Sequence, residues 1–438
     1  MATLSRRRFF HSAGMALTAA EASRVMGAND RIQAAVIGLG GRGQAHVKTY
    51  LTLPEAEIAA LCDVNQEALE RTQAVVERAT SKTPKGYVDM REVFADKNID
   101  CVSMPLPNHW HALATIWACQ AGKDVYVEKP ACHNVFEGRQ MIEAARKYGR
   151  IVQIGSQGRT SPHKRKAAQL LADGIIGKVY MARGLCFNRR RSIGHKEDEP
   201  VPRGLDWDKF LGPAPMRPYN ELRFKYNWHW FWDTGNGDIG NQGIHQMDIA
   251  RWGLGRGLPT RVVSTGGKFI YKDDQETANT QIATFDYGDA EIVFEVRGLT
   301  TGSEGGLENR TDSYTIGNLY YGSDGWMAVG GRTFQVYKGE KGEKIMDETS
   351  ATGRGDGENG PHFRNFFQAM RSRNPKDLNA DVEVGVTSAV LVHIANISYR
   401  LRRELAFDPQ TWTFPGDAEA NRMLTREYRA PYIVPEKV

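Results

Sequence analysis

The sequence predicts a two-domain α/β protein: an N-terminal Rossmann domain with a parallel, doubly wound sheet, then a C-terminal α+β domain with a mostly antiparallel sheet. Its 438 residues exceed what one small core holds, which favours two domains. Strand and helix patterns alternate over residues 31–155, as in parallel sheets joined by helical crossovers. Over residues 156–438 several segments alternate apolar with polar residues, which is typical of an antiparallel sheet with one solvated face.

In the first domain each short apolar strand leads into a helix. Strands are expected at 34–37, 57–62, 99–103, 124–127 and 151–154, and helices at 44–50, 66–78, 110–121 and 135–148.

In the second domain a helix over 163–172 ends before Gly174, a suitable C-terminal cap. Residues 188–240 form a polar and aromatic loop region, longer than a compact domain normally tolerates without a function. Further strands are expected at 179–187, 261–270, 280–287, 290–296, 313–321 and 333–337, and helices at 361–372 and 382–404.

The composition, 41% hydrophobic and 25% charged, is that of an ordinary soluble globular protein. The net charge is +5, and residues 1–30 contribute +2 of it, so the weak remainder argues against nucleic acid as a partner. The five cysteines show neither metal-ligand spacing nor a disulfide framework, which predicts small buried hydrophobes and no metal site. No later segment approaches the roughly eighteen apolar residues of a membrane helix, so no membrane insertion is expected.

The N-terminus predicts export. Ser5-Arg6-Arg7-Arg8-Phe9-Phe10 resembles the twin-arginine signal, and a modest apolar stretch follows over 13–20. Ala20-Glu21-Ala22 is a candidate cleavage site, so residues 1–30 are interpreted as a signal and the mature protein as periplasmic. The alternative is a basic N-terminus without signal function, on a cytoplasmic protein.

A glycine-rich turn, Gly38-Leu39-Gly40-Gly41-Arg42-Gly43, follows the first predicted strand and opens a helix. In such a turn the glycines permit the bend, the approach of a pyrophosphate and close packing of helix on strand. Asp63 ends the second strand, where its carboxylate can accept hydrogen bonds from the adenosine ribose hydroxyls. Its charge would repel a 2′-phosphate, so NAD is favoured over NADP. Arg42 leaves NADP open, because an arginine near that ribose could accommodate a phosphate.

Glu128-Lys129-Pro130 closes the apolar run 124–127. Ligands of open α/β sheets lie at the carboxyl ends of the strands, so Lys129 is expected beside the nicotinamide. Burial and a cationic nicotinamide would both lower the pKa of this lysine toward a range useful for proton transfer.

With these motifs the chain resembles the glucose–fructose oxidoreductase, inositol dehydrogenase and rhizopine-catabolism (Gfo/Idh/MocA) family. The matching segments are 38–43, Asp63, Pro105-Leu106-Pro107-Asn108-His109-Trp110-His111, 128–130 and Gly240-Asn241-Gln242-Gly243-Ile244-His245-Gln246-Met247-Asp248. The resemblance covers nearly everything after residue 30. It implies a C-terminal domain whose large open sheet often mediates homo-oligomers, as a dimer or tetramer, and chemistry on a sugar or cyclitol hydroxyl.

The resemblance also implies roles for single residues. Lys129 and His245 would handle the hydroxyl proton or bind substrate, Asn108 and His111 would lie at the nicotinamide half of the cofactor, and Pro105 and Glu128 would also contact the cofactor. Asn241 is also predicted to bind substrate, but it departs from the family, whose dehydrogenases commonly carry aspartate four residues before the histidine. An asparagine can orient the ring but adds no negative charge, which shifts the proton transfer toward Lys129.

Two further substrate-binding predictions concern the aromatic loop and the last Rossmann strand. Trp228, Trp230 and Trp232 alternate, so in an extended segment they would share one face and could stack on a sugar, or pack as a buried aromatic strand. Gln157 lies just past the strand at 151–154 and is a weaker candidate.

The expected function is an NAD-dependent oxidoreductase that transfers hydride at a secondary hydroxyl of a sugar, cyclitol or sugar derivative. A periplasm holds no pool of free NAD, so an exported enzyme should carry a tightly bound cofactor and regenerate it within its cycle. Two alternatives remain open: an NAD-dependent glycosidase acting by transient oxidation, elimination and re-reduction, and a non-catalytic protein that binds a dinucleotide or sugar.

Overall fold

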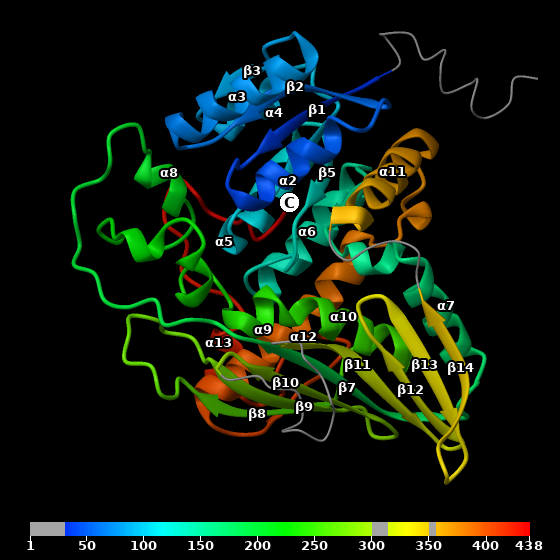
Figure 1. Cartoon of the computed structure of the whole chain (residues 1–438). Helices are drawn as coiled ribbons and strands as arrows, with labels where there is room; N and C mark the ends of the chain where they lie inside the picture. Colours follow the sequence, from blue (N-terminus) through cyan, green and yellow to red (C-terminus); the bar gives the residue numbers. More distant parts are fainter. Residues whose placement is uncertain (1–30, 300–313, 350–355) are drawn as a thin grey trace, which may run out of the picture.

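The computed structural model describes residues 31–299, 314–349 and 356–438. The predicted signal over 1–30 lies outside the described residues. Figure 1 shows the Rossmann domain on one side of the molecule and one large sheet on the other, with helices between them. This is the predicted fold class.

The Rossmann sheet has six parallel strands in the order β3-β2-β1-β4-β5-β6. Its strands are β1 (Ile32–Ile37), β2 (Ala56–Cys62), β3 (Lys85–Tyr87), β4 (Cys101–Met104), β5 (Asp124–Val127) and β6 (Val152–Ile154). The crossover helices are α2 (Gly41–Tyr50), α3 (Gln66–Thr80), α4 (Met90–Ala95), α5 (Asn108–Gln120) and α6 (Val135–Lys147). The four central strands are almost entirely buried, as expected for a parallel sheet covered on both faces.

The C-terminal sheet has nine strands in the order β14-β13-β12-β11-β7-β10-β9-β8-β15. Among these pairs only β7 and β10 run parallel. Its strands are β7 (Val179–Asn188), β8 (Arg261–Gly267), β9 (Thr280–Asp286), β10 (Glu291–Arg297), β11 (Tyr314–Gly322), β12 (Gly325–Val329), β13 (Thr333–Lys338), β14 (Glu343–Thr349) and β15 (Leu405–Ala406).

Two helices, α10 (Gly243–Leu254) and α12 (Val382–Leu401), cover one face of this sheet and lie between it and the Rossmann domain (Figure 1). The remaining helices are α7 (Pro162–Ala172), α8 (Trp207–Leu211), α9 (Gly237–Asn241), α11 (Asp356–Ser372) and α13 (Ala418–Arg422), with short 3-10 helices η2 (Gln157–Thr160), η3 (Glu221–Arg223), η4 (Asn227–Trp230) and η5 (Pro375–Asp377).

Helix α12 corrects the expectation that no later segment has the length and apolarity of a membrane helix. It is 20 residues long with a mean hydropathy of 1.3, but 83% of that window is buried inside the protein. Its apolar character is explained by packing between the large sheet and α6. All five cysteines are buried and free, in agreement with their prediction as small core residues.

Helix α11 belongs to the core of the Rossmann domain although it lies more than two hundred residues after β6. Phe363, Phe366 and Phe367 are buried in one cluster with residues of β1, β2 and α2. The ring of Phe363 stacks on Tyr126 of β5 with a centroid distance of 4.2 Å. Residues 31–155 therefore do not contain the complete core of the nucleotide domain.

Candidate active site

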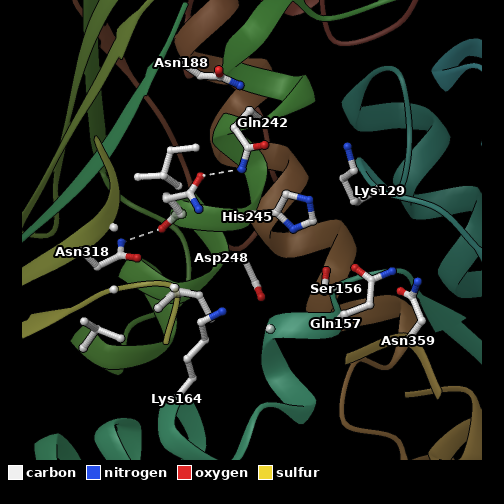
Figure 2. Close-up of a pocket in the computed structure, with 18 of the residues that line it drawn as sticks. Lys129, Ser156, Gln157, Lys164, Asn188, Gln242, His245, Asp248, Asn318 and Asn359 are labelled. Carbon is white, nitrogen blue, oxygen red and sulfur yellow. Dashed lines mark hydrogen bonds between the residues drawn. The ribbon is translucent and has the colours of Figure 1, made fainter. Parts of the chain in front are cut away.

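A cavity of about 530 Å³ lies between the carboxyl edge of the Rossmann sheet and the C-terminal domain. Lys129 and Glu128 follow β5, Gln157 begins η2, and His245 lies on α10. Figure 2 shows the His245 ring in the middle of this space, with Lys129 on one side and Asn318 on the opposite side. Residues far apart in the sequence therefore form one site.

The Lys129 ammonium donates a hydrogen bond to the backbone carbonyl of Asn241, with an Nζ–O distance of 2.9 Å. Burial lowers the pKa of Lys129 to about 8, against the opposing charge of Glu128. A lysine with this pKa exchanges its proton near neutral pH, which is the property a general base requires.

His245 presents its ring to the cavity, and in the described part of the chain its side chain makes no hydrogen bond. Burial and, after it, the nearby Lys129 charge lower the pKa of His245 to about 3. The imidazole is therefore neutral and has both ring nitrogens available to a ligand.

Glu128 is the charged centre of a buried hydrogen-bond network. Its Oε1 accepts from Arg42 Nε at 2.8 Å and from Gln157 Nε2 at 3.0 Å, and it lies 3.1 Å from His46 Nε2. Burial would raise the pKa of Glu128, but the Arg42 guanidinium and His46 hold it well below its ordinary value. Arg42 also donates to Asn359 of α11, so its side chain lies on the cavity side of the glycine turn.

Asn241 is placed differently from its prediction. Its side chain is buried and donates to the Tyr226 hydroxyl at 2.9 Å and to Asp238 at 3.3 Å, and it does not hydrogen-bond the His245 ring. Asp238 in turn forms a two-bond ion pair with Arg190 at 3.0 and 2.8 Å. The contribution of Asn241 to the site is therefore its backbone carbonyl, and the prediction that its side chain orients His245 is wrong.

The glycine turn offers the space that a dinucleotide needs. A Cβ on Gly43 would lie 2.0 Å from the Gly38 carbonyl oxygen, and Gly38 has a φ of +94°, so both positions require glycine. Gly40 and Gly41, in contrast, face open space, with no atom within 4 Å of an added Cβ. Helix α2 begins at Gly41 without a capping side chain, so no cap competes with a phosphate for its first backbone N–H groups.

Asp63 fits the ribose position at the end of β2. Its carboxylate accepts from the Leu39 N–H at 2.6 Å and from the Asn65 N–H at 2.8 Å, which fixes it against the glycine turn. Burial raises the pKa of Asp63, and these two backbone bonds oppose that effect.

Three residues after β4, Pro105, Asn108 and His111, are predicted to contact the cofactor, and they differ in the groups that surround them. Pro105 packs against the turn, with its carbonyl oxygen 3.0 Å from the Cβ position of Gly38. Asn108 is buried and donates to Asn236 at 2.9 Å, while its Oδ1 has no partner among the described residues. That orphaned acceptor suits the carboxamide N–H of a nicotinamide.

His111 is the exception among these residues. Its two ring nitrogens lie 2.6 Å from the Pro130 carbonyl and 2.8 Å from the Leu106 carbonyl, and its ring is fully buried. A neutral imidazole donates only one of these bonds, so His111 braces the loops after β4 and β5 from outside the cavity lining, and its contact with the cofactor remains a prediction.

The prediction that Trp228, Trp230 and Trp232 share one face and stack on a sugar is also wrong. Residues 227–230 form the 3-10 helix η4, so alternate side chains do not share a face. Trp228 stacks on His229 with a centroid distance of 3.6 Å, and Trp230 is buried beneath Arg190. Neither indole lines the cavity.

Most of the polar residues that line the cavity lie outside the sequence motifs. Side-chain amides surround it, from Gln157, Asn188, Gln242, Gln246, Asn318 and Asn359. Lys164 of α7 also lines it, as does Asp248, which forms a buried ion pair with Arg159 at 2.8 and 2.9 Å. Only Gln242, Gln246 and Asp248 lie within a quoted motif. Within residues 31–299, 314–349 and 356–438, no group of three or more His, Cys, Asp or Glu side chains could hold a metal ion.

Comparison with known proteins agrees with this geometry. Residues 32–156 match the model of the oxidoreductase family with an NAD-binding Rossmann fold, and residues 166–294 and 328–434 match the C-terminal α/β domain of the same family. The chain belongs to the Gfo/Idh/MocA oxidoreductase family. It is accordingly an oxidoreductase-family protein with an NAD-binding Rossmann fold.

Three proteins similar to this chain show the range of the family. The myo-inositol 2-dehydrogenase of Thermotoga maritima is 23% identical over 76% of this chain and 81% of its own length. A glycosyl hydrolase family 109 protein of Saccharopolyspora erythraea is 26% identical over 38% of this chain and 37% of its own length. The structure of levoglucosan dehydrogenase with NADH and levoglucosan superposes with a TM-score of 0.66 at 18% identity, covering 86% of this chain and 99% of that one. Several other curated family members, such as the inositol 2-dehydrogenase of Salmonella typhimurium, are matched over half of their length or less.

Proposed function

We propose that this protein oxidises a secondary hydroxyl of a sugar, cyclitol or sugar derivative with a tightly held NAD. The observation that carries the proposal is the placement of Lys129, with its pKa near 8, and of the unpartnered His245 ring in one cavity at the carboxyl edge of the Rossmann sheet. When bound, NAD supplies the hydride acceptor. The glycine turn, Asp63 and Asn108 would hold it.

We assign the removal of the substrate's hydroxyl proton to Lys129. In its neutral form the amine accepts the hydroxyl proton, while the Asn241 carbonyl holds the Nζ in position. His245, neutral throughout the ordinary pH range, donates or accepts a hydrogen bond at the same hydroxyl and orients it. Glu128 keeps its negative charge and holds Arg42 and Gln157 around the site.

The lining favours a substrate rich in hydroxyl groups. An amide offers both a donor and an acceptor, which suits the paired hydroxyls of a sugar or cyclitol. The cavity of about 530 Å³ is within the ordinary size of a small-molecule site.

NAD is proposed over NADP. Asp63 places a carboxylate at the ribose position, and Arg42, the candidate phosphate ligand, is instead paired with Glu128. Titrating the protein with NADH and with NADPH tests this, and tighter binding of NADPH would contradict it.

The proposal also includes export of the protein to the periplasm and its assembly as a homo-oligomer. The twin-arginine pattern favours a periplasmic enzyme that leaves the cytoplasm folded and loaded with cofactor. Replacement of Arg6 and Arg7 by lysine should then retain the protein in the cytoplasm, and unchanged export would contradict the signal. The open face of the C-terminal sheet carries the exposed side chain of Ile282, and the family resemblance implies assembly through this sheet, which together favour a homo-oligomer. A monomeric mass by light scattering would exclude that assembly.

The decisive experiment is to denature the purified protein, identify the nucleotide released, and assay intact protein against a panel of sugars and cyclitols. Stoichiometric NAD with net NADH formation supports the proposal. Release of aglycone from aryl glycosides without added cofactor would instead support the glycosidase alternative, for which the resemblance to the family 109 protein is the specific observation. Sugar and NAD binding without any turnover would support the non-catalytic alternative.

A further inference from the structure

A second cavity, of about 680 Å³, lies beside the carboxyl end of β2. Val64 and Val88, which follow β2 and β3, form one wall. The opposite wall comes from residues 201–219 of the C-terminal domain, here called the strap, through side chains that include Val201, Leu205 and Met216. Because Val64 directly follows Asp63, this cavity adjoins the ribose position of the nucleotide site.

The strap pairs with the Rossmann chain just after Asp63. The Gln66 N–H donates to the Gly204 carbonyl and the Asp206 N–H to the Val64 carbonyl, each at 2.9 Å, and Asn65 and Leu205 form an isolated antiparallel bridge. The C-terminal domain is thus attached by backbone hydrogen bonds to the segment that follows the ribose-binding position.

The second attachment of the strap is at α5. The Trp110 indole N–H lies 3.0 Å from the carbonyl oxygens of both Lys209 and Phe210. A Cβ on Gly212 would lie 2.1 Å from the Trp110 ring, so the strap follows the indole closely. The C-terminal tail fixes α8 from outside, since Arg429 and the Tyr432 hydroxyl both bond the Asp208 carboxylate.

The chemistry of this cavity suits adenosine. Val201 and Met216 are 45% and 57% exposed, so apolar surface remains for a flat aromatic ring. Asp206 and Asp208 also line the space, and their carboxylates are paired with Lys209 and Arg429.

We propose that the strap is the outer wall of the adenine site and retains the cofactor. NAD leaves only when residues 201–219 separate from Val64 and Trp110, so its dissociation is slow compared with turnover. This inference rests on the proposed function in taking NAD as the ligand, and it explains how one domain of the enzyme retains a nucleotide bound to the other.

The test measures binding without substrate, on the purified full chain. In a Val201→Ser/Met216→Ser variant, NADH chased by excess NAD should dissociate at least about tenfold faster, and ADP-ribose should bind about tenfold more weakly. Nicotinamide mononucleotide, which lacks adenosine, should bind unchanged. Ile345→Ser on β14, similarly exposed at 44%, is the matched control and should leave all three values unchanged.

A second variant, Asp208→Ala, releases α8 from the tail and should also accelerate NADH dissociation. Dissociation rates within roughly twofold of the wild type in both variants, or an equal loss of nicotinamide mononucleotide binding, would overturn the proposal. Absence of turnover with every sugar, at normal NADH retention, would instead overturn the proposed function and leave the strap inference intact.

Discussion

The Nζ of Lys129 and the backbone carbonyl oxygen of Asn241 are 2.9 Å apart. This bond joins the end of β5 in the Rossmann domain to α9 in the C-terminal domain. The position of the candidate base therefore depends on α9, and α9 is held by the buried ion pair of Asp238 with Arg190. Lys129 and the residues that position it can therefore be tested with separate variants.

Replacement of Lys129 by methionine should lower kcat by about 10²–10⁴-fold, because the side chain keeps its length but loses the proton acceptor. NADH binding should remain within about threefold of wild type, since the glycine turn and Asp63 are untouched. Steady-state kinetics and NADH fluorescence titration measure the two effects. Lys166→Met, at an exposed lysine of α7, is the control, and equal losses in both variants would contradict the assignment.

The pH dependence of oxidation should follow Lys129. Below about pH 8 the amine is protonated and cannot accept the hydroxyl proton, so kcat/KM should rise with pH and level off above this value. Ketone reduction needs the protonated amine, so its rate should fall over the same range. Parallel pH profiles in both directions, with the same slope, would refute a single proton acceptor at this position.

Asp238→Asn should shift that profile to lower pH. Removing the carboxylate takes away a charge that raises the pKa of Lys129 and leaves the Arg190 cation, which lowers it. The opposite change is Asn241→Asp, which adds a negative charge next to Asp238, on the residue whose carbonyl accepts from Lys129, and should move the midpoint above 8. A merely structural role for these residues would lower kcat without moving the midpoint in opposite directions.

Phe363→Ala should destabilise the nucleotide domain by about 3–5 kcal/mol, because it removes a fully buried ring from the cluster around Tyr50 and Tyr126. Urea unfolding followed by tryptophan fluorescence measures the change. Phe269→Ala, at a side chain that is 49% exposed, should cost under about 1 kcal/mol. Similar losses in the two variants would show that α11 is not part of this core.

The sequence predicted the fold class because alternating strands and helices and a period-2 pattern are local signals. It missed β3, which has only three residues, two of them exposed, and β14, whose side chains are mostly exposed, because neither presents an apolar run. It also missed the short strands β12 and β15. The helix α11 was predicted, but not its place in the Rossmann core, because no local pattern records which domain a helix joins.

The sequence predicted those site residues that lie in a recognisable motif or directly after a predicted strand. Lys129, Glu128, Gln157 and His245 were all predicted and lie in one cavity. Asn188, Asn318 and Asn359 could not be predicted, because each is a single amide on a different element and only the tertiary structure brings them together. The tryptophan prediction failed because it assumed an extended backbone, whereas the segment forms the 3-10 turn η4.

The place of α11 in the nucleotide domain also affects how the protein is made. A nascent chain that ends at residue 155 contains all six parallel strands, yet lacks the phenylalanines that cover Tyr50 and Tyr126. The apolar surface beside the glycine turn is closed only after about residue 372 has left the ribosome. We therefore expect nucleotide loading to depend on nearly complete synthesis, and a fragment that carries the whole dinucleotide fingerprint should bind NAD poorly.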